Sequence, residues 1–252
     1  MELSPKHSET ELSETPMAKP AFEFDPDRLI EPVGVRPESE LSDPDYVAKK
    51  VEGLGETEQE TRILENGNAL YDSPIETGEL LNSDQGNAVP GFQGDCGLVS
   101  CENVARLAGK DVTEADAVKI ARDGGLCLDG YDSPEDNGAT TFLGICEVLS
   151  RLGIEPALLF EPDAESIADA VESGRGVIAG VEVSEFWENY PYEGYHAVTI
   201  TSVERDPTGN PVAFYVCDSG SGNGDFARRV DAATMERSLD GDPVVMTEMP
   251  IR

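Results

Sequence analysis

The chain has 252 residues, enough for one sizeable domain and a tail. Its 51 acidic and 18 basic residues give a formal net charge of −33, which argues against binding to nucleic acids or anionic membranes, since both need a basic surface. The hydrophobic fraction of 38% is below the usual value of about 45–50%, so we expect part of the chain to lie outside a packed core. A halophilic source and an ordinary acidic protein both fit this charge.

Residues 1–69 are rich in Glu, Ser, Asp and Pro, and prolines recur from Pro5 to Pro44. Such a composition cannot bury enough surface to offset chain entropy, so we expect a disordered acidic tail with one short helix near Tyr46–Gly53. A recruiting, export or pro-segment is the alternative. Residues 70–252 are then the folded domain.

The N-terminus shows no apolar core of a secretory signal, and no apolar run reaches the length of about 18 residues that spans a membrane. The five cysteines form no CxxC pair. We therefore expect reduced thiols, a cytoplasmic location and no membrane contact, with signal-independent export as the alternative.

Four helices are predicted from apolar periodicity and capping residues. Thr113 is a plausible N-cap, with the carboxylate of Asp116 three residues later. The helices span Leu98–Leu107, a segment opening at Thr113, Thr140 or Thr141 to Leu152, and Asp163–Ser173.

The pattern then changes to β-branched runs that predict strands, with a turn over Asp206–Asn210. The expected strands are Gly176–Val183, His196–Val203, Val212–Cys217 and Val244–Thr247. Helices followed by a mostly antiparallel sheet predict an α+β domain.

Three residues on these elements have the types and settings of a thiol-dependent hydrolase. Cys96 lies where a loop gives way to a helix, and a helix N-terminus lowers the pKa of a thiol. His196 opens a strand and could exchange the proton, and Asp218, after the next strand, could orient the imidazole. The backbone N–H of Cys96 and the side chain of Gln93 are the expected oxyanion donors.

The other cysteines are weaker candidates for the nucleophile. Cys101 would lie about 140° around the helix from Cys96, away from the helix N-terminus. Cys217 should point to the opposite strand face from Asp218, into the core. Cys127 and Cys146 have no neighbouring base in the sequence.

Aromatic residues gather just before His196, and we expect Trp187 and Tyr195 to line the substrate cleft. Packing of a long loop is the alternative. The acidic residues of this loop indicate a polar or positively charged substrate; they are Glu185, Glu188 and Glu193.

Three segments together resemble the papain-like cysteine peptidase superfamily, most closely its C39-like peptidases and the papain-fold domains of bacterial toxins and effectors. They are Gly94–Cys101 (GDCGLVSC), Gly194–Val198 (GYHAV) and Val216–Gly220 (VCDSG), and Thr140–Ile154 adds to the C39-like pattern. The resemblance spans about residues 85–225. Its motifs are short, so they specify the superfamily better than the family.

The resemblance implies a papain-like fold, with Cys96 as nucleophile, His196 as base and Asp218 as the orienting acid. The chain departs from the family at the oxyanion glutamine, which usually lies six residues before the cysteine, where this chain has Pro90. Either a change in loop length brings Gln93 or Gln85 into that place, or another donor serves.

The implied activity is cleavage or transfer at an amide bond of a protein or peptide substrate. Peptidase, glutamine deamidase and transglutaminase would use the same three residues. An NlpC/P60-type cell-wall amidase is an alternative, because Asp95–Val99 (DCGLV) is similar to that family's motif; the shorter cysteine-to-histidine spacing of that family counts against it. A non-enzymatic papain-fold interaction module is another.

No cofactor and no metal are expected. His7 and His196 are the only histidines, and the cysteines lack zinc-site spacing. The acidic segment Asp129–Asp136 lacks the EF-hand pattern, and no phosphate-binding loop is present. The sequence leaves the oligomeric state undetermined.

Overall fold

The computed structural model describes residues 61–71, 81, 84–87, 89–187, 190–191, 193–220 and 225–251, and only the backbone of residues 225–227. Most of the expected acidic tail, including the helix expected near Tyr46–Gly53, lies outside these residues.

The four predicted helices are present as α4 (Cys96–Leu107), α5 (Glu114–Gly124), α6 (Phe142–Arg151) and α7 (Ala164–Glu172). Thr113 caps α5 as expected, and its side chain and that of Asp116 form a reciprocal capping box. Two short helices were not expected: α8 (Val183–Phe186) and α9 (Ala232–Ser238).

The strands form an eight-stranded sheet, and every pairing among the described strands is antiparallel. The four predicted strands correspond to β4 (Val177–Glu182), β5 (Tyr195–Arg205), β6 (Pro211–Asp218) and β8 (Val244–Thr247). The strands not expected are β1 (Thr61–Ile63), β2 (Ala69–Tyr71), β3 (Pro156–Leu159) and β7 (Asp225–Asp231).

The long strand β5 organises the sheet. It pairs with β4 over residues 195–200 and with β2 over residues 203–205, while β6 pairs with it over residues 199–205. The remaining strands extend the sheet on both sides, β8 and β3 beyond β4 and β7 beyond β6. The strand that carries His196 therefore lies between two partners near the middle of the sheet.

The β1–β2 hairpin lies across residue 70, the domain boundary expected from composition. Strand β1 and residue Ala69 precede that boundary, and the β1–β2 hairpin joins the edge of β5. Leu70 is buried, and the carboxylate of Glu204 on β5 accepts a hydrogen bond from the side chain of Asn68. The hairpin was missed because its strands are only three residues long.

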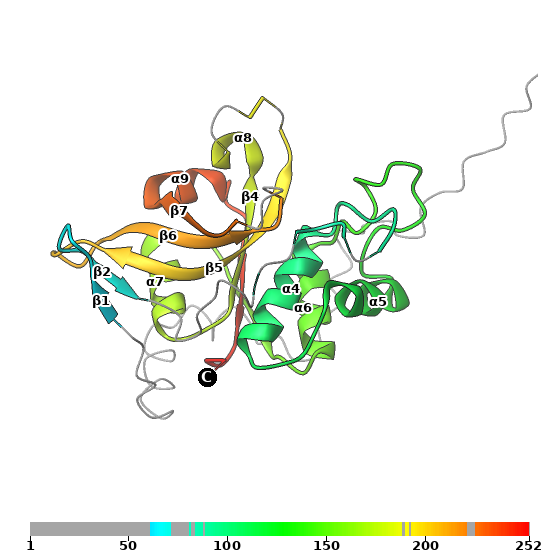
Figure 1. The fold of residues 1–252 in the computed structure, drawn as a ribbon, viewed down its shortest axis with the longest axis horizontal. Helices are drawn as coiled ribbons and strands as arrows, with labels where there is room; N and C mark the ends of the chain where they lie inside the picture. The colour runs from blue at the N-terminus through cyan, green and yellow to red at the C-terminus, as the bar shows by residue number, and fades with distance from the viewer. Residues whose placement is uncertain are drawn as a thin grey trace, which may run out of the picture.

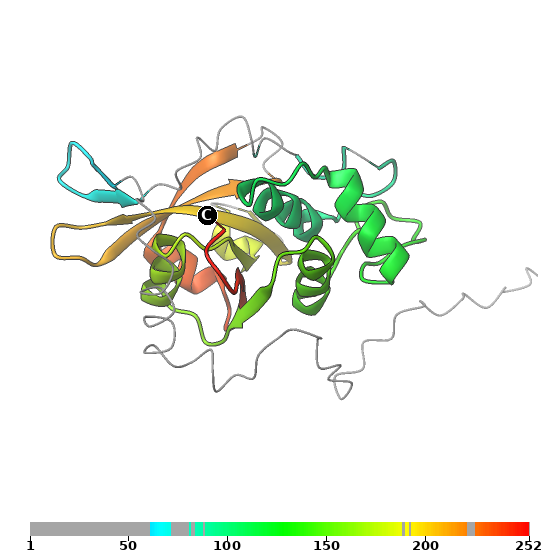
Figure 2. The same ribbon diagram turned by 90° about the horizontal axis from the view of Figure 1, so that it is seen from below.

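Helices cover both faces of the sheet (Figures 1 and 2). On one face α4 and α6 pack against Ile178, Ala197 and Val245 in a shared apolar cluster. On the other face α7 and α9 pack against a second cluster whose sheet residues include Val177, Ala179, Val181, Val198, Ile200 and Phe214. Successive side chains along β4 and β5 therefore point alternately into two separate hydrophobic cores. Because both faces of the sheet are covered, the sequences of these strands are nearly continuous apolar runs.

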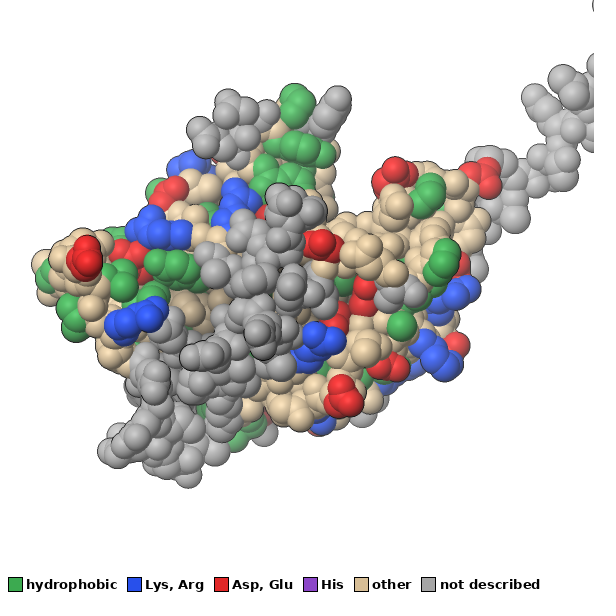
Figure 3. Space-filling view, viewed as in Figure 1, with side chains coloured by type: hydrophobic (Ala, Val, Ile, Leu, Met, Phe, Trp, Pro, Cys, Tyr) green, Lys and Arg blue, Asp and Glu red, His purple; other side chains and the backbone are tan. Residues whose placement is uncertain are grey.

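The surface carries charges of both signs. Figure 3 shows acidic and basic side chains interspersed over one face of the molecule. No helix in the described part of the chain is long and apolar enough to cross a bilayer.

Candidate active site

Cys96 is the first residue of α4, as predicted, and Asp95 is its N-cap. The carbonyl of Asp95 accepts hydrogen bonds from the N–H groups of Leu98 and Val99 at 2.8 and 3.0 Å. The Cys96 side chain is partly exposed at this end of the helix. The free N–H groups and the dipole of a helix N-terminus stabilise a thiolate in this position.

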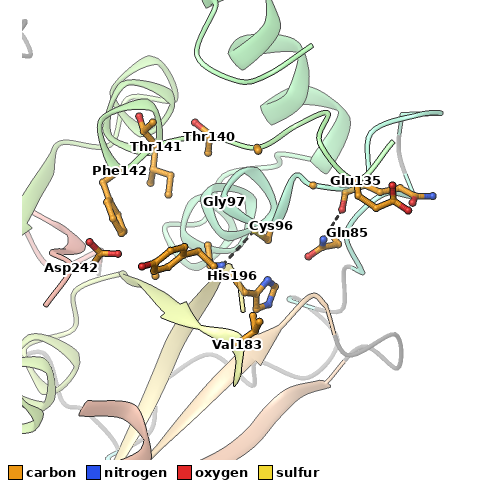
Figure 4. A pocket seen from close by; sticks show the side chains of 18 of the residues that line it. Gln85, Cys96, Gly97, Glu135, Thr140, Thr141, Phe142, Val183, His196 and Asp242 are labelled. Carbon is orange, nitrogen blue, oxygen red and sulfur yellow. Dashed lines mark hydrogen bonds between the residues drawn. The ribbon is translucent and has the colours of Figure 1, made fainter. Parts of the chain in front are cut away.

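His196 lies on β5 where the strand passes the start of α4. The N–H of Ala197 donates to Cys96 Sγ at 3.4 Å, so helix and strand are in direct contact (Figure 4). Pairing with β4 places Val181 opposite His196, which fixes the strand on one side. The imidazole is 5% exposed.

Asp218, the last residue of β6, faces the same histidine. Its Oδ1 lies 2.9 Å from His196 Nε2. Because an ionised carboxylate can only accept hydrogen bonds, Nε2 must carry the proton, and Nδ1 is the nitrogen left for Cys96. The structure thus brings together all three residues that the sequence proposed, from one helix start and two adjacent strands.

The carboxylate of Asp218 is buried and accepts hydrogen bonds from several of the described residues besides His196. Its Oδ1 also accepts from the N–H of Gly220 at 3.0 Å, and its Oδ2 accepts from Trp187 Nε1 at 2.7 Å and Arg228 Nη1 at 3.0 Å. Burial raises the pKa of Asp218, but the hydrogen bonds and charge of His196 and the donor Trp187 outweigh it, and the pKa falls to about 2. The group is therefore anionic at neutral pH.

The electrostatics favour a thiolate and an imidazolium. Burial raises the pKa of Cys96, but the hydrogen bond and charge of His196 and the N–H groups of Ala197 and Gly97 outweigh it, so the pKa is lowered. Burial lowers the pKa of His196, while the hydrogen bonds to Asp218 and Cys96 raise it to about 9. The two groups stabilise each other's charged form.

Three of the other cysteines lie in environments that raise the pKa of their thiols. Burial raises the pKa of Cys101, raises that of Cys146 to about 12 and raises that of Cys127 to about 11. Cys217 is buried in the core, as expected from strand alternation. Burial raises the pKa of Cys96 as well as those of Cys101, Cys127 and Cys146, and the hydrogen bond and charge of His196 are what lower that of Cys96.

Gln93 and Gln85, the two candidate oxyanion donors, differ in exposure and in hydrogen bonding. The Gln93 side chain is exposed, and its backbone carbonyl accepts a hydrogen bond from Gln85 Nε2 at 2.6 Å. Gln85 is half-buried and is held further by Ser219, whose hydroxyl donates to Gln85 Oε1 at 3.2 Å and whose carbonyl accepts from the Gln85 N–H at 3.1 Å. Figure 4 shows the Gln85 amide beside Cys96.

A cavity of about 700 Å³ opens in front of Cys96, with both glutamines in its lining. In Figure 4, Phe142 and Asp242 lie on one side of Cys96, and Gln85 and Glu135 on the other. The cavity is also lined by Trp187 and Tyr195, the residues expected at the substrate cleft.

Trp187 and Tyr195 have different surroundings. The Trp187 ring centroid is 5.1 Å from that of His196, so the indole covers the histidine and also donates to Asp218. Tyr195 is 66% exposed, and its hydroxyl donates to Asp240 Oδ2 at 3.3 Å. Tyr195 can meet a substrate without rearrangement, whereas much of Trp187 is engaged with the two polar residues.

Arg228 and Glu114 were not singled out from the sequence. Arg228 lies on β7 and donates both to Asp218 and to the Phe186 carbonyl, at 2.8 Å. The pair Arg228 and Arg229, ten residues after Asp218, was the available signal. Their strand begins at Asp225, whose backbone pairs with Asp218. No group of three or more His, Cys, Asp or Glu suited to a metal occurs among the described residues.

Comparisons with known proteins give similarity only at the level of structure. No family model matches the chain, and no curated protein matches it. One similar solved structure, titled as a C39-like peptidase from Bacillus anthracis, has 16% identity and a TM-score of 0.44, covering 66% of this chain and 92% of that one. Another is a double glycine motif protease from an AMS/PCAT transporter in complex with the leader peptide, with 14% identity and a TM-score of 0.40, covering 66% and 89%.

Proposed function

We propose that this chain is a cysteine-dependent hydrolase of amide bonds in peptides or proteins. Cys96 is the nucleophile, His196 the acid and base, and Asp218 the residue that orients His196. The observation that carries the proposal is the chain of contacts from Asp218 through His196 to Cys96, which ends at the opening of a cavity large enough for several residues of a peptide.

In the first step the thiolate of Cys96 attacks the carbonyl carbon of the substrate, and the carbonyl oxygen becomes an oxyanion. His196, protonated on both nitrogens, then gives the Nδ1 proton to the leaving amine as the C–N bond breaks. Asp218 keeps the ring in place through Nε2 and stabilises its positive charge. The product of this step is a thioester on Cys96 and a free amine.

In the second step water attacks the thioester. Neutral His196 accepts a proton from the water through Nδ1, and the tetrahedral intermediate collapses with loss of the Cys96 thiolate. The carboxylate product leaves, and the thiolate and imidazolium are restored. Trp187 limits the access of water to the bond between His196 and Asp218, because its ring covers one side of the histidine.

For the oxyanion we propose the backbone N–H of Cys96 and the side chain of Gln85. An amide nitrogen has two N–H groups, and Gln85 uses one toward the Gln93 carbonyl. Its oxygen is held by Ser219, which fixes the plane of the amide. Gln93, the donor first expected, has its side chain exposed.

The state of the cysteines bears on the compartment. All five cysteines are free, Cys96 among them, and free thiols are the usual state of cysteines in reducing compartments such as the cytosol. We therefore propose that the enzyme works where thiols are kept reduced, in line with the expected cytoplasmic location.

A mixed-sequence peptide library tests the function. The wild-type chain and Cys96→Ala are incubated with the library, and the products are identified by mass spectrometry. New peptide termini that depend on Cys96 support a peptidase. Conversion of glutamine to glutamate without chain cleavage would replace this conclusion with a deamidase that uses the same residues, and identical spectra for the two proteins contradict the proposal.

A further inference from the structure

The carboxyl groups of Asp95 and Glu114 meet in the interior behind the candidate nucleophile. Asp95 is 0% exposed and Glu114, the first residue of α5, is 6% exposed. The two side chains are within hydrogen-bonding distance of each other. A pair of buried carboxyl groups that touch must share a proton to avoid two adjacent buried charges.

Both carboxyl groups also bind the loop that carries Gln85. The N–H of Gly86 donates to Asp95 Oδ1 at 3.0 Å and to Glu114 Oε1 at 2.9 Å, and the N–H of Asn87 donates to Glu114 Oε1 at 3.2 Å. Gly86 has φ +80, and a Cβ there would lie 3.1 Å from the Phe92 carbonyl oxygen, so this loop takes a tight path that glycine permits.

The hydrogen bonds to Gly86 and Asn87 do not account for every oxygen of the two carboxyl groups. Asp95 Oδ2 is buried, and none of the described residues donates a hydrogen bond to it. A carboxyl group that carries a proton can itself donate toward Glu114, which suits a buried group with an oxygen that receives no hydrogen bond. Gly138 covers the other side of Asp95, since a Cβ on Gly138 would lie 2.6 Å from the Asp95 Cβ.

We propose that Asp95 and Glu114, sharing one proton, are positioning residues that hold the Gly86 loop so that Gln85 can donate to the oxyanion. The proposal rests on the proposed function of Cys96 and Gln85. Asp95 connects the nucleophile directly to the loop of Gln85. It precedes Cys96 in the chain, and its carbonyl accepts the first hydrogen bonds of α4. Its side chain binds the N–H of Gly86, the residue after Gln85.

The shared proton predicts a dependence on pH. Burial, the hydrogen bond to Glu114 and the Glu114 charge raise the pKa of Asp95 to about 7. Above that pH Asp95 loses its proton and its charge repels the Glu114 carboxylate, which loosens the Gly86 loop. Among the described residues, Cys127 also interacts with Asp95, and its pKa is raised to about 11, so it stays neutral through this range. Cys96 is the next residue in the chain after Asp95.

A comparison of two reactions of Cys96 isolates the oxyanion site without a natural substrate. With p-nitrophenyl acetate the thiolate adds to the ester carbonyl, and the oxyanion collapses to an acetyl thioester with release of p-nitrophenolate. With iodoacetamide the thiolate displaces iodide at a saturated carbon and no oxyanion forms. The ratio of the acylation rate to the alkylation rate therefore reports oxyanion stabilisation alone.

We expect Glu114→Ala to lower this ratio about 10-fold to 100-fold, less than the 10²–10³ lost when an oxyanion donor is removed outright. Glu114→Gln should restore it, because the amide oxygen can accept from Gly86 and the amide N–H can replace the shared proton. The wild-type ratio should fall above pH 7, and that of Glu114→Gln should stay level. Asp123→Ala is the matched control, since Asp123 is an exposed carboxylate on the same helix, paired with Lys119.

The outcomes separate this inference from the function on which it rests. If Cys96→Ala reacts with both reagents as fast as the wild type, Cys96 is not the nucleophile and the proposed function fails. If Cys96 reacts but Glu114→Ala keeps the wild-type ratio, or lowers it no more than Asp123→Ala, the positioning role is wrong. A Glu114→Gln ratio that falls above pH 7 like that of the wild type also overturns it.

Discussion

Trp187 and Asp218, 31 residues apart in the chain, are joined by a hydrogen bond of 2.7 Å from the indole N–H to Oδ2. The same indole lies against His196, with ring centroids 5.1 Å apart. One side chain thus both binds the proposed acid, Asp218, and covers the proposed base, His196. Arg228 donates to the same oxygen at 3.0 Å, so the carboxylate is held from two directions.

Replacing Trp187 separates these two contributions. Trp187→Phe loses the hydrogen bond and keeps a ring over His196, so we expect the acylation rate of Cys96 by p-nitrophenyl acetate to fall about 10-fold, since a hydrogen bond to a charged group contributes roughly 1.5–3 kcal/mol. Trp187→Ala should lose more, because water also reaches the bond between His196 and Asp218. Equal rates for the wild type and both variants would show that the indole only fills space.

The thiol of Cys96 should alkylate faster than the other four at pH 6. Its pKa is lowered by His196, whereas burial raises those of Cys101, Cys127 and Cys146. Labelling with iodoacetamide followed by peptide mapping measures each site, and Cys96→Ala is the control. First labelling at Cys101 or Cys127 would contradict the assignment of the nucleophile.

Asp218→Asn keeps the shape of the acid and removes its charge. Without that charge the imidazolium is less stable, so the pKa of His196 falls and that of Cys96 rises. We expect alkylation of Cys96 to slow at pH 6 and to recover toward alkaline pH, and turnover to drop roughly 10-fold to 10⁴-fold, the upper value being that of serine proteases. Asp206→Asn, in the turn before β6, is the control. A larger loss of turnover in this variant than in Asp218→Asn would contradict the assignment of Asp218 as the acid.

The choice between the two glutamines can be made by their alanine variants. Gln85→Ala should lower acylation by p-nitrophenyl acetate about 10²-fold to 10³-fold with little change in alkylation by iodoacetamide, because only acylation passes through an oxyanion. Gln93→Ala should leave both rates within about 2-fold, since Gln93 binds Gln85 through its backbone carbonyl. The opposite pattern would return the oxyanion role to Gln93.

Two truncations test where the domain begins. Removal of residues 1–60 should leave the melting temperature nearly unchanged, as expected of an acidic, proline-rich tail that adds little to a core. Removal of residues 1–71 takes away the β1–β2 hairpin with its buried Leu70, and should lower the melting temperature by several degrees. Thermal unfolding followed by circular dichroism measures both. A similar drop for the shorter truncation would show that the tail packs on the domain.

The sequence by itself predicted the elements whose signal is local. Capping residues and 3.6-residue periodicity identified α4 to α7, and β-branched runs identified β4, β5, β6 and β8. The three candidate site residues could be proposed for the same reason, because each stands at the start of a helix or near one end of a strand with a recognisable pattern. The base for Cys96 could also be proposed from the sequence, because His196 is the only histidine outside the expected tail.

Only the tertiary structure decided what depends on long-range pairing. The β1–β2 hairpin and β7 are short or charged segments that become strands because β5 and β6 offer open edges, and no local pattern encodes that. The surroundings of the proposed triad are equally non-local: Arg228 reaches Asp218 from the neighbouring strand β7, and Glu114 on α5 reaches the loop at Gly86. Burial then sets the pKa values of these groups, because removal of water makes a charge depend on whichever partner the fold brings near it.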